Sequence, residues 1–123
     1  MDIKRLHVGK TLSEIAIYNG TVYLAGQVSE NGAKGIAAQT REVLGHIDRL
    51  LAEAGSDKTR ILMCQIFLKD IRSFAGMNEV WNEWVEDGHA PPRATVVAKL
   101  AKPEWLVEIV VTAAQAKLFT HHF

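Results

Sequence analysis

The chain has 123 residues, and this length predicts one domain over residues 1–123 that can bury about two-thirds of its extended-chain surface. Its 14 basic residues balance 14 acidic ones without forming a basic run, which argues against nucleic acid or an anionic membrane as a partner. The single cysteine, Cys64, excludes an internal disulfide and a multi-cysteine zinc site. The sequence has no apolar run of the roughly 20 residues that a membrane span needs, and it has no signal-peptide core. We therefore expect a cytoplasmic protein.

Three strands and a loop are predicted before the first helix. Ile3–Val8 forms the first strand. Glu14–Tyr18 and Thr21–Gln27 flank Asn19-Gly20, and both residues of this pair tolerate the positive φ of a type I′ hairpin turn. Residues 29–35 are polar and contain glycine, which predicts a loop.

The hydrophobic period changes between Ile36 and Ala54. Apolar residues recur there every three or four positions, which predicts an amphipathic helix, and Gly55 is placed to end it as the C′ residue. After a polar stretch, Ile61–Leu68 is apolar except for Gln65. We predict that this segment is a central strand, buried on both faces.

A second helix is predicted over Ser73–Asp87, because its large apolar residues recur at helical spacing and Gly88 follows as a stop. Two strands rich in β-branched residues come next, within residues 89–99 and Leu106–Val111, and the proline between them cannot donate to a ladder. The tail, from about residue 115 to Phe123, has no clear period, so we expect it to be peripheral.

The predicted element order is β-β-β-α-β-α-β-β, which indicates an α+β fold. Two amphipathic helices separated by a buried strand favour a mixed sheet with both helices packed on one face. A chain of this size has no further element to cover the other face. We therefore expect it to self-associate.

Two charged residues, Arg93 and Glu108, lie in the last two predicted strands. Arg93 follows two prolines, and Glu108 lies in an apolar run, where an ionised carboxylate is costly unless it is paired, exposed or used. One interpretation is a structural ion pair between neighbouring strands. The other is functional: an arginine fork grips a substrate carboxylate beside a carboxylate that handles a proton. The residues alone leave both interpretations open.

Other residue types offer weaker candidates for chemistry. The chain has no P-loop, dinucleotide fingerprint, HExxH or GxSxG motif. Cys64 lies in the predicted buried strand, so we interpret it as a core residue rather than a nucleophile. The five histidines, including His121-His122 at the chain end, show no metal-ligand spacing. Trp81 and Trp84 have a spacing typical of core or interface aromatics, with a pocket lining as the alternative.

Several motifs together resemble the Rid family (RidA, formerly YjgF) of reactive-intermediate imine deaminases. The likeness runs from Ser13 to Ala114, and the segments that carry it are Asn19–Gln27, Ile66–Asp70, Phe74-Ala75, Met77-Asn78, Gly88–Thr95 and Leu106–Ile109. The interval between Arg93 and Glu108 also agrees with the family. The greatest likeness is to a short, single-domain bacterial branch with a Trp-Asn-Glu-Trp helix, here residues 81–84, and a Gly-His-Ala-Pro motif, here residues 88–91.

The resemblance implies a chorismate-mutase-like α+β fold that forms a homotrimer with a central barrel and small clefts between subunits. It also implies hydrolysis of 2-imino acids and enamines, such as 2-iminopropanoate and 2-iminobutyrate, to 2-oxo acids and ammonia. No metal or other cofactor is expected, because an imine is already electrophilic. A positioned water with proton transfer can supply roughly 10²–10⁴-fold acceleration.

The resemblance further implies roles for individual residues. Arg93 would hold the substrate carboxylate, and Glu108 would orient or activate water. The remaining positions that would line the same cleft are the backbone at Thr95, the segment around Gly26, and Asn78 and Trp81 on the second helix.

Two positions depart from the family pattern. Leu12 stands where the family has a cleft tyrosine, and Thr95 stands where a cysteine is usual. The second change matters less if the backbone amide binds the substrate. The missing tyrosine hydroxyl predicts either a different preferred 2-imino acid or a slow deaminase.

Two other classes of function stay open. A trimeric binding module, which senses a small carboxylate or binds another protein, would use Arg93 and Glu108 to grip without turnover. Endoribonuclease activity is less favoured, because the chain has no net positive charge to attract RNA.

Overall fold

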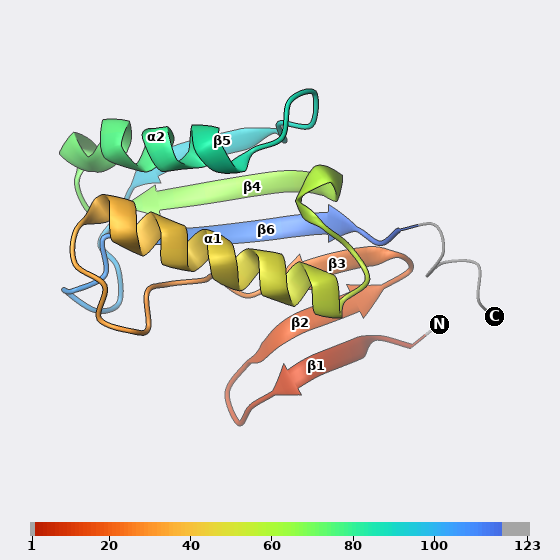
Figure 1. Cartoon of the computed structure of the whole chain (residues 1–123). Helices are drawn as coiled ribbons and strands as arrows, with labels where there is room; N and C mark the ends of the chain where they lie inside the picture. Colours follow the sequence, from red (N-terminus) through yellow and green to blue (C-terminus); the bar gives the residue numbers. More distant parts are fainter. Residues whose placement is uncertain (1, 117–123) are drawn as a thin grey trace.

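The computed structural model describes residues 2–116 and arranges them as a six-stranded sheet with two α-helices (Figure 1). The strands are β1 (Lys4–Val8), β2 (Ser13–Tyr18), β3 (Thr21–Leu24), β4 (Ile61–Leu68), β5 (Arg93–Val97) and β6 (Val107–Ala114). The helices are α1 (Ile36–Glu53) and α2 (Phe74–Trp84), and 3₁₀ turns precede β4 (Lys58–Arg60) and α2 (Ile71–Ser73). This succession confirms the predicted order of strands and α-helices.

The sheet has the strand order β1-β2-β3-β6-β4-β5. β4 and β5 run parallel and the other neighbouring pairs are antiparallel, so the predicted mixed sheet is confirmed. The turn between β2 and β3 is formed by Asn19 and Gly20, whose φ values of 51° and 79° are positive as the predicted hairpin requires.

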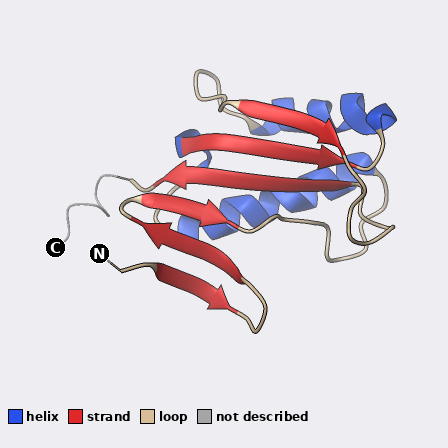
Figure 2. Ribbon diagram, turned by 180° about the vertical axis from the view of Figure 1, so that it is seen from behind, coloured by secondary structure: helices blue, strands red, loops and turns tan. Residues whose placement is uncertain are grey.

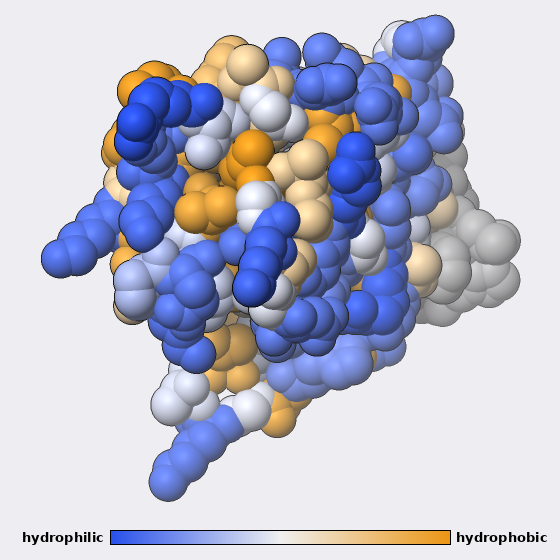
Figure 3. All heavy atoms as spheres, turned by 60° about the vertical axis from the view of Figure 1, so that its left-hand side comes forward, coloured by the Kyte–Doolittle hydropathy of each residue, from blue (hydrophilic) through white to orange (hydrophobic). Residues whose placement is uncertain are grey.

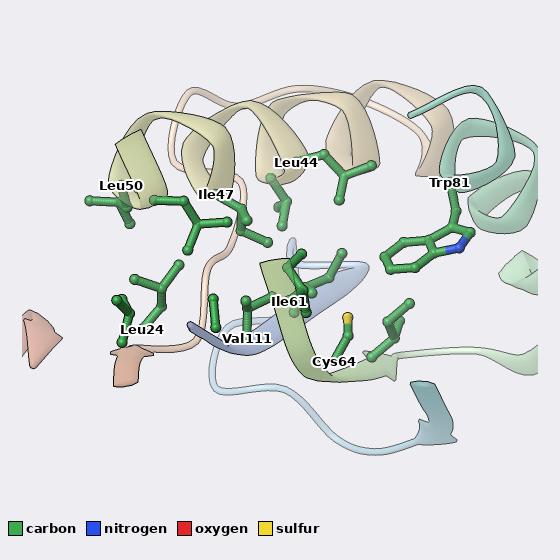
Figure 4. Close-up of a cluster of buried hydrophobic side chains, with 14 of the residues drawn as sticks. Leu24, Leu44, Ile47, Leu50, Ile61, Cys64, Trp81 and Val111 are labelled. Carbon is green, nitrogen blue, oxygen red and sulfur yellow. The ribbon is translucent and has the colours of Figure 1, made fainter. Parts of the chain in front are cut away.

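Both α-helices pack on the same face of the sheet, as predicted. α1 crosses β6 and β3 and packs against α2, which lies beside β4 and β5 (Figure 1). Alternate residues of the strands point toward the helices: Val107, Ile109, Val111 and Ala113 of β6 pair with Leu68, Ile66, Cys64 and Ile61 of β4, and all eight are buried. Figure 4 shows Leu44, Ile47 and Leu50 of α1 above this layer. Full burial of a side chain of this size contributes about 1.5–3 kcal/mol.

The predicted end of the first helix is confirmed in its detail. Gly55 follows the last helical turn with φ 78°, a left-handed conformation that costs glycine little. Its N–H donates to the carbonyl of Ala52 (3.1 Å), and the N–H of Ser56 donates to the carbonyl of Leu51 (2.8 Å). These two bonds form a Schellman motif and satisfy carbonyls that the helix end would otherwise leave open.

Three predictions about individual elements are wrong in part. β4 lies inside the sheet, but residues 2–116 bury only one of its faces, since Met63 and Gln65 are exposed on the other. α2 ends at Trp84 rather than near residue 87, because Val85 is extended (φ −69°, ψ 139°) and Lys58 Nζ donates to the carbonyl of Trp84 (2.7 Å). β3 ends at Leu24 rather than at Gln27, because the chain then leaves the ladder to form a loop.

The other face of the sheet has no helix over it within residues 2–116 (Figure 2). Large hydrophobic side chains are exposed there, including Tyr23 (48%), Met63 (37%) and Val96 (49%). This bears out the expectation that one chain leaves a sheet face open.

The ends of the chain are described only in part. Of the tail that we expect to be peripheral, Gln115 and Ala116 are described, and they bond to the carbonyls of Ala54 (2.8 Å) and Gly55 (2.9 Å). Residues 117–123, with His121-His122, lie outside the described residues. Neither α-helix of the described part combines the length and apolarity that crossing a membrane requires.

Candidate active site

Arg93 begins β5 on the face of the sheet that α2 covers. The preceding prolines hold an extended approach, and the carbonyl of Pro92 accepts a bond from the N–H of Cys64 (3.0 Å), which sets the parallel register. The guanidinium donates from Nη1 to Oδ1 of Asn78 (2.7 Å). It also stacks over Trp81, with Cζ 5.1 Å from the ring centroid, and lies 6.0 Å from that of Phe74.

The partners of Arg93 come from one face of α2. Phe74, Asn78 and Trp81 are spaced four and three residues apart, so they lie above one another on the helix. The hydrogen bond and the two aromatic rings hold the guanidinium in one orientation. The hydrogen bond to Asn78 uses one of the five N–H donors of the guanidinium.

Thr95 lies two residues after Arg93 and therefore points to the same face of β5. Its hydroxyl oxygen is buried and has no hydrogen-bond partner within the described residues. A buried hydroxyl without a partner is unfavourable, typically by about 1–3 kcal/mol. Of the residues that the resemblance to the Rid family implies for one cleft, Arg93, Asn78, Trp81 and Thr95 are thus on one face of the sheet.

Glu108 lies on the opposite face of the sheet, against Gly26. The N–H of Gln27 donates to the carbonyl of Ile109 (2.9 Å), and the N–H of Ile109 donates to that of Gln27 (3.1 Å), which fixes the two segments side by side. A Cβ on residue 26 would overlap the Glu108 carboxylate. Glycine at this position therefore provides the space that the carboxylate occupies.

A cavity of about 970 Å³ opens beside Glu108. The loops that follow β3 and precede β6 form its walls, and Leu12, Glu14, Gly26 and Gln27 contribute to its lining. Figure 3 turns this end of the molecule forward, where hydrophobic side chains are visible between projecting hydrophilic ones. Leu12 is 57% exposed, so it contributes an accessible apolar side chain to this cavity.

The structural ion pair between Arg93 and Glu108 is a wrong interpretation for a single chain. β4 lies between β5 and β6, so the two strands are not neighbours. Across β4, Arg93 is level with Val111, while Glu108 is level with Val96. Because Arg93 points toward α2 and Glu108 points away from the helices, the sheet itself separates the two side chains.

Three residues beside these groups were not identified from the sequence. Phe74 contacts Arg93, and helical spacing from Asn78 and Trp81 could have indicated it. Glu14 and Gln27 line the cavity, and Gln27 Nε2 donates to Glu14 Oε1 (3.4 Å). Nothing in the local sequence distinguishes them from ordinary strand residues.

Cys64 and Trp81 are both buried in the core, and the ring of Trp81 also lies under Arg93. Burial raises the pKa of the Cys64 thiol to about 12, which the nearby Arg93 only partly offsets, so the thiol is a poor nucleophile. Trp81 is buried in the core and packs against Trp84 with ring centroids 5.4 Å apart. Among residues 2–116, no three His, Cys, Asp or Glu side chains are grouped so that they could hold a metal ion.

Comparisons with known proteins agree on one family. The family model described as Endoribonuclease L-PSP matches residues 3–115. A RutC family protein of Haemophilus influenzae is 51% identical over 114 residues, which cover 92% of this chain and 98% of that protein. A more distant relative, the 2-iminobutanoate/2-iminopropanoate deaminase of Bos taurus, is 29% identical over 114 residues, or 88% of this chain and 82% of that enzyme.

The fold agrees with that of solved relatives. A member of the YjgF protein family from Neisseria meningitidis superposes with a TM-score of 0.92 at 46% identity, covering 94% of this chain and 97% of that one. Relatives at this identity and coverage share both the fold and the ancestry of the sequence. The chain therefore belongs to the endoribonuclease L-PSP family, the YjgF or Rid family that its motifs resemble.

Proposed function

We propose that this protein hydrolyses 2-imino acids to 2-oxo acids and ammonia without a cofactor, at clefts formed between copies of the chain. The observation that carries the proposal is the division of the two charged residues between opposite faces of the sheet. Each lies in a prepared setting: Arg93 is held by Asn78 and Trp81, and Glu108 lies in a cavity against Gly26. A site that needs both is completed when Arg93 of one copy meets Glu108 of another.

The setting of Arg93 suits a substrate carboxylate. Asn78 and Trp81 fix the plane of the guanidinium, so binding a carboxylate does not have to order a free side chain. Two parallel N–H···O bonds are geometrically specific, and each charge-assisted bond contributes roughly 1.5–3 kcal/mol. The N–H of Thr95, on the same strand, is a further donor for this ligand.

Glu108 acts as the general base and general acid of the proposed reaction. The imine enters protonated on nitrogen, and the Glu108 carboxylate accepts a proton from a water molecule as the water oxygen attacks the imine carbon, which gives a neutral carbinolamine. Glu108 then returns this proton to the amino group. As the C–N bond breaks and the C=O bond forms, Glu108 accepts the hydroxyl proton and passes it to the departing ammonia, so the products are the 2-oxo acid and ammonium. General acid–base catalysis of this kind contributes about 10²–10⁴-fold.

The assembly that we propose is a homotrimer in which the open sheet faces enclose a central barrel. The exposed hydrophobic residues of that face, Tyr23, Met63 and Val96, would then be buried against neighbouring copies. The Bos taurus relative named as a 2-iminobutanoate/2-iminopropanoate deaminase supports the reaction class. Leu12 in place of tyrosine favours a preference for a different 2-imino acid.

The test generates 2-iminobutyrate with an amino-acid oxidase and compares its decay with and without the protein. We expect decay to accelerate in proportion to protein concentration, and no acceleration would refute the deaminase. If 2-oxobutyrate binds by calorimetry without any turnover of the imine, a carboxylate-binding module is the correct function. Cleavage of RNA under the same conditions would favour the ribonuclease that the family description names.

A further inference from the structure

One buried side chain joins the two loops that wall the cavity beside Glu108. Gln39 lies in the first half of α1 and is 4% exposed. Its Nε2 donates to the carbonyl of Ala33 (3.1 Å) in the loop after β3, and to the carbonyl of Glu104 (2.9 Å) in the loop before β6. Its Oε1 accepts a bond from the N–H of Leu106 (2.8 Å).

The three hydrogen bonds use both N–H donors and the oxygen of the amide. The two loops are far apart in sequence, since Glu104 comes 71 positions after Ala33. Ala33, Glu104 and Leu106 all line the cavity. A glutamine amide can bridge two carbonyls and one N–H because it carries two donors and an acceptor on one rigid plane.

A second contact holds the other end of the loop after β3. The Glu42 carboxylate, one turn further along α1, accepts bonds from Ser29 Oγ (2.7 Å) and from the N–H groups of Glu30 (2.7 Å) and Asn31 (3.2 Å). Burial raises the pKa of Glu42, but the hydrogen bonds from Ser29, Glu30, His46 and Asn31 outweigh it and lower the pKa below its ordinary value. Glu42 fixes one loop, whereas Gln39 contacts both.

The hydrogen bonds of Gln39 hold the two chain segments that lie next to Glu108. Leu106 is two residues before Glu108, and its N–H is the one that Gln39 holds at the start of β6. On the other wall, the loop that Gln39 holds at Ala33 also contains Gln27, whose backbone pairs with Ile109 beside the carboxylate. Both segments that surround the carboxylate are therefore tied to the same side chain.

We propose that Gln39 is a positioning residue for the reaction, acting through the two loops that set the location of the Glu108 carboxylate. This inference rests on the proposed function. Gln39 lines the cavity beside Glu108, whereas Arg93, which would grip the substrate, is held by side chains of α2. Loss of Gln39 is therefore expected to lower kcat more than it raises KM.

The test replaces the amide with a carboxylate of the same shape. Gln39→Glu keeps an acceptor for Leu106 but loses the donors to Ala33 and Glu104. The matched control is Gln115→Glu, which makes the same change where Nε2 donates to the Ala54 carbonyl, away from the cavity. We expect Gln39→Glu to lower kcat about ten- to a hundredfold, because displacement of a catalytic group by about 1 Å costs on that order. Gln115→Glu should keep wild-type kcat.

Hydrogen exchange provides a readout that does not need activity. In Gln39→Glu, amides of residues 28–35 and 101–106 should exchange faster, while amides of β4 keep their protection. If these loops exchange as in the wild type, or if kcat matches that of the Gln115→Glu control, the positioning role is refuted. Should the wild type fail to hydrolyse imines, the proposed function falls, and the exchange of the loops alone decides whether Gln39 holds them. If Gln39→Glu does not fold, Gln39→Met is used for both measurements.

Discussion

Adding one methyl group at Gly26 tests the position of the Glu108 carboxylate. In Gly26→Ala, the new Cβ would overlap Oε2 of Glu108 and lie 3.0 Å from Cδ and 3.2 Å from Cγ. These atoms are the end of a flexible side chain, so the carboxylate can move aside without disturbing the backbone. Gly26 does not have a positive φ, so alanine fits its conformation.

The expected effect of Gly26→Ala on stability is much smaller than its expected effect on the rate of imine hydrolysis. Moving Glu108 off its preferred rotamer costs about 0.5–1.5 kcal/mol, while replacing glycine stabilises the fold by about 0.4–1 kcal/mol through the unfolded chain. The free energy of unfolding should thus change by no more than about 1 kcal/mol, or roughly 4 °C in Tm for a chain of this length. A carboxylate displaced by about 1 Å should lower the rate of imine hydrolysis about 10²-fold.

The assay measures imine decay and Tm for Gly26→Ala and for a control, Gly45→Ala. Gly45 lies in α1 with no atom within 4 Å of an added Cβ, so alanine there should stabilise the fold by about 0.5–1 kcal/mol and leave the rate unchanged. Full activity in Gly26→Ala would show that the observed place of Glu108 is not used in the reaction.

Three further predictions follow from the same geometry. Arg93→Lys keeps the positive charge but loses the planar pair of N–H donors, so kcat/KM should fall about tenfold or more and binding of 2-oxobutyrate should weaken in calorimetry. Unchanged activity on 2-imino acids would contradict the role of Arg93 in binding the substrate carboxylate. Glu108→Gln should keep Tm and ligand binding while slowing hydrolysis about tenfold or more, because an amide cannot accept the proton from the attacking water. Turnover at the wild-type rate would show that Glu108 has no catalytic role. Light scattering coupled to size exclusion should give about three times the chain mass of 13.6 kDa, and a monomer at micromolar concentration would remove the intersubunit site.

The separation of Arg93 from Glu108 changes how their neighbours are interpreted. In the part of the chain that the structure describes, Arg93 contacts an amide oxygen and an aromatic face rather than a carboxylate. Neither contact neutralises its charge, so the guanidinium retains its attraction for an anion. This setting favours a ligand-binding role for Arg93 over a structural one.

Local pattern determined much of this fold. The positive φ that Asn19 and Gly20 accept gave the hairpin, and the apolar period of Ile36–Ala54 gave the long helix with its glycine stop. These features depend on residues close together in sequence, so their physical causes can be read directly from it. Arg93 and Asn78 belong to separate motifs, and only the resemblance to the Rid family implied that they share one cleft; the structure joins them by a hydrogen bond.

Only the tertiary structure decided where Glu108, the second half of the candidate site, lies. Two strands that follow each other in sequence need not be neighbours, and the insertion of β4 between β5 and β6 places Glu108 on the face opposite to Arg93. The same holds for Gln39, whose partners Ala33, Glu104 and Leu106 meet it only after the two loops fold over α1. Strand order and loop packing depend on contacts between distant residues, and the alternation of polar and apolar residues along one strand carries no information about them.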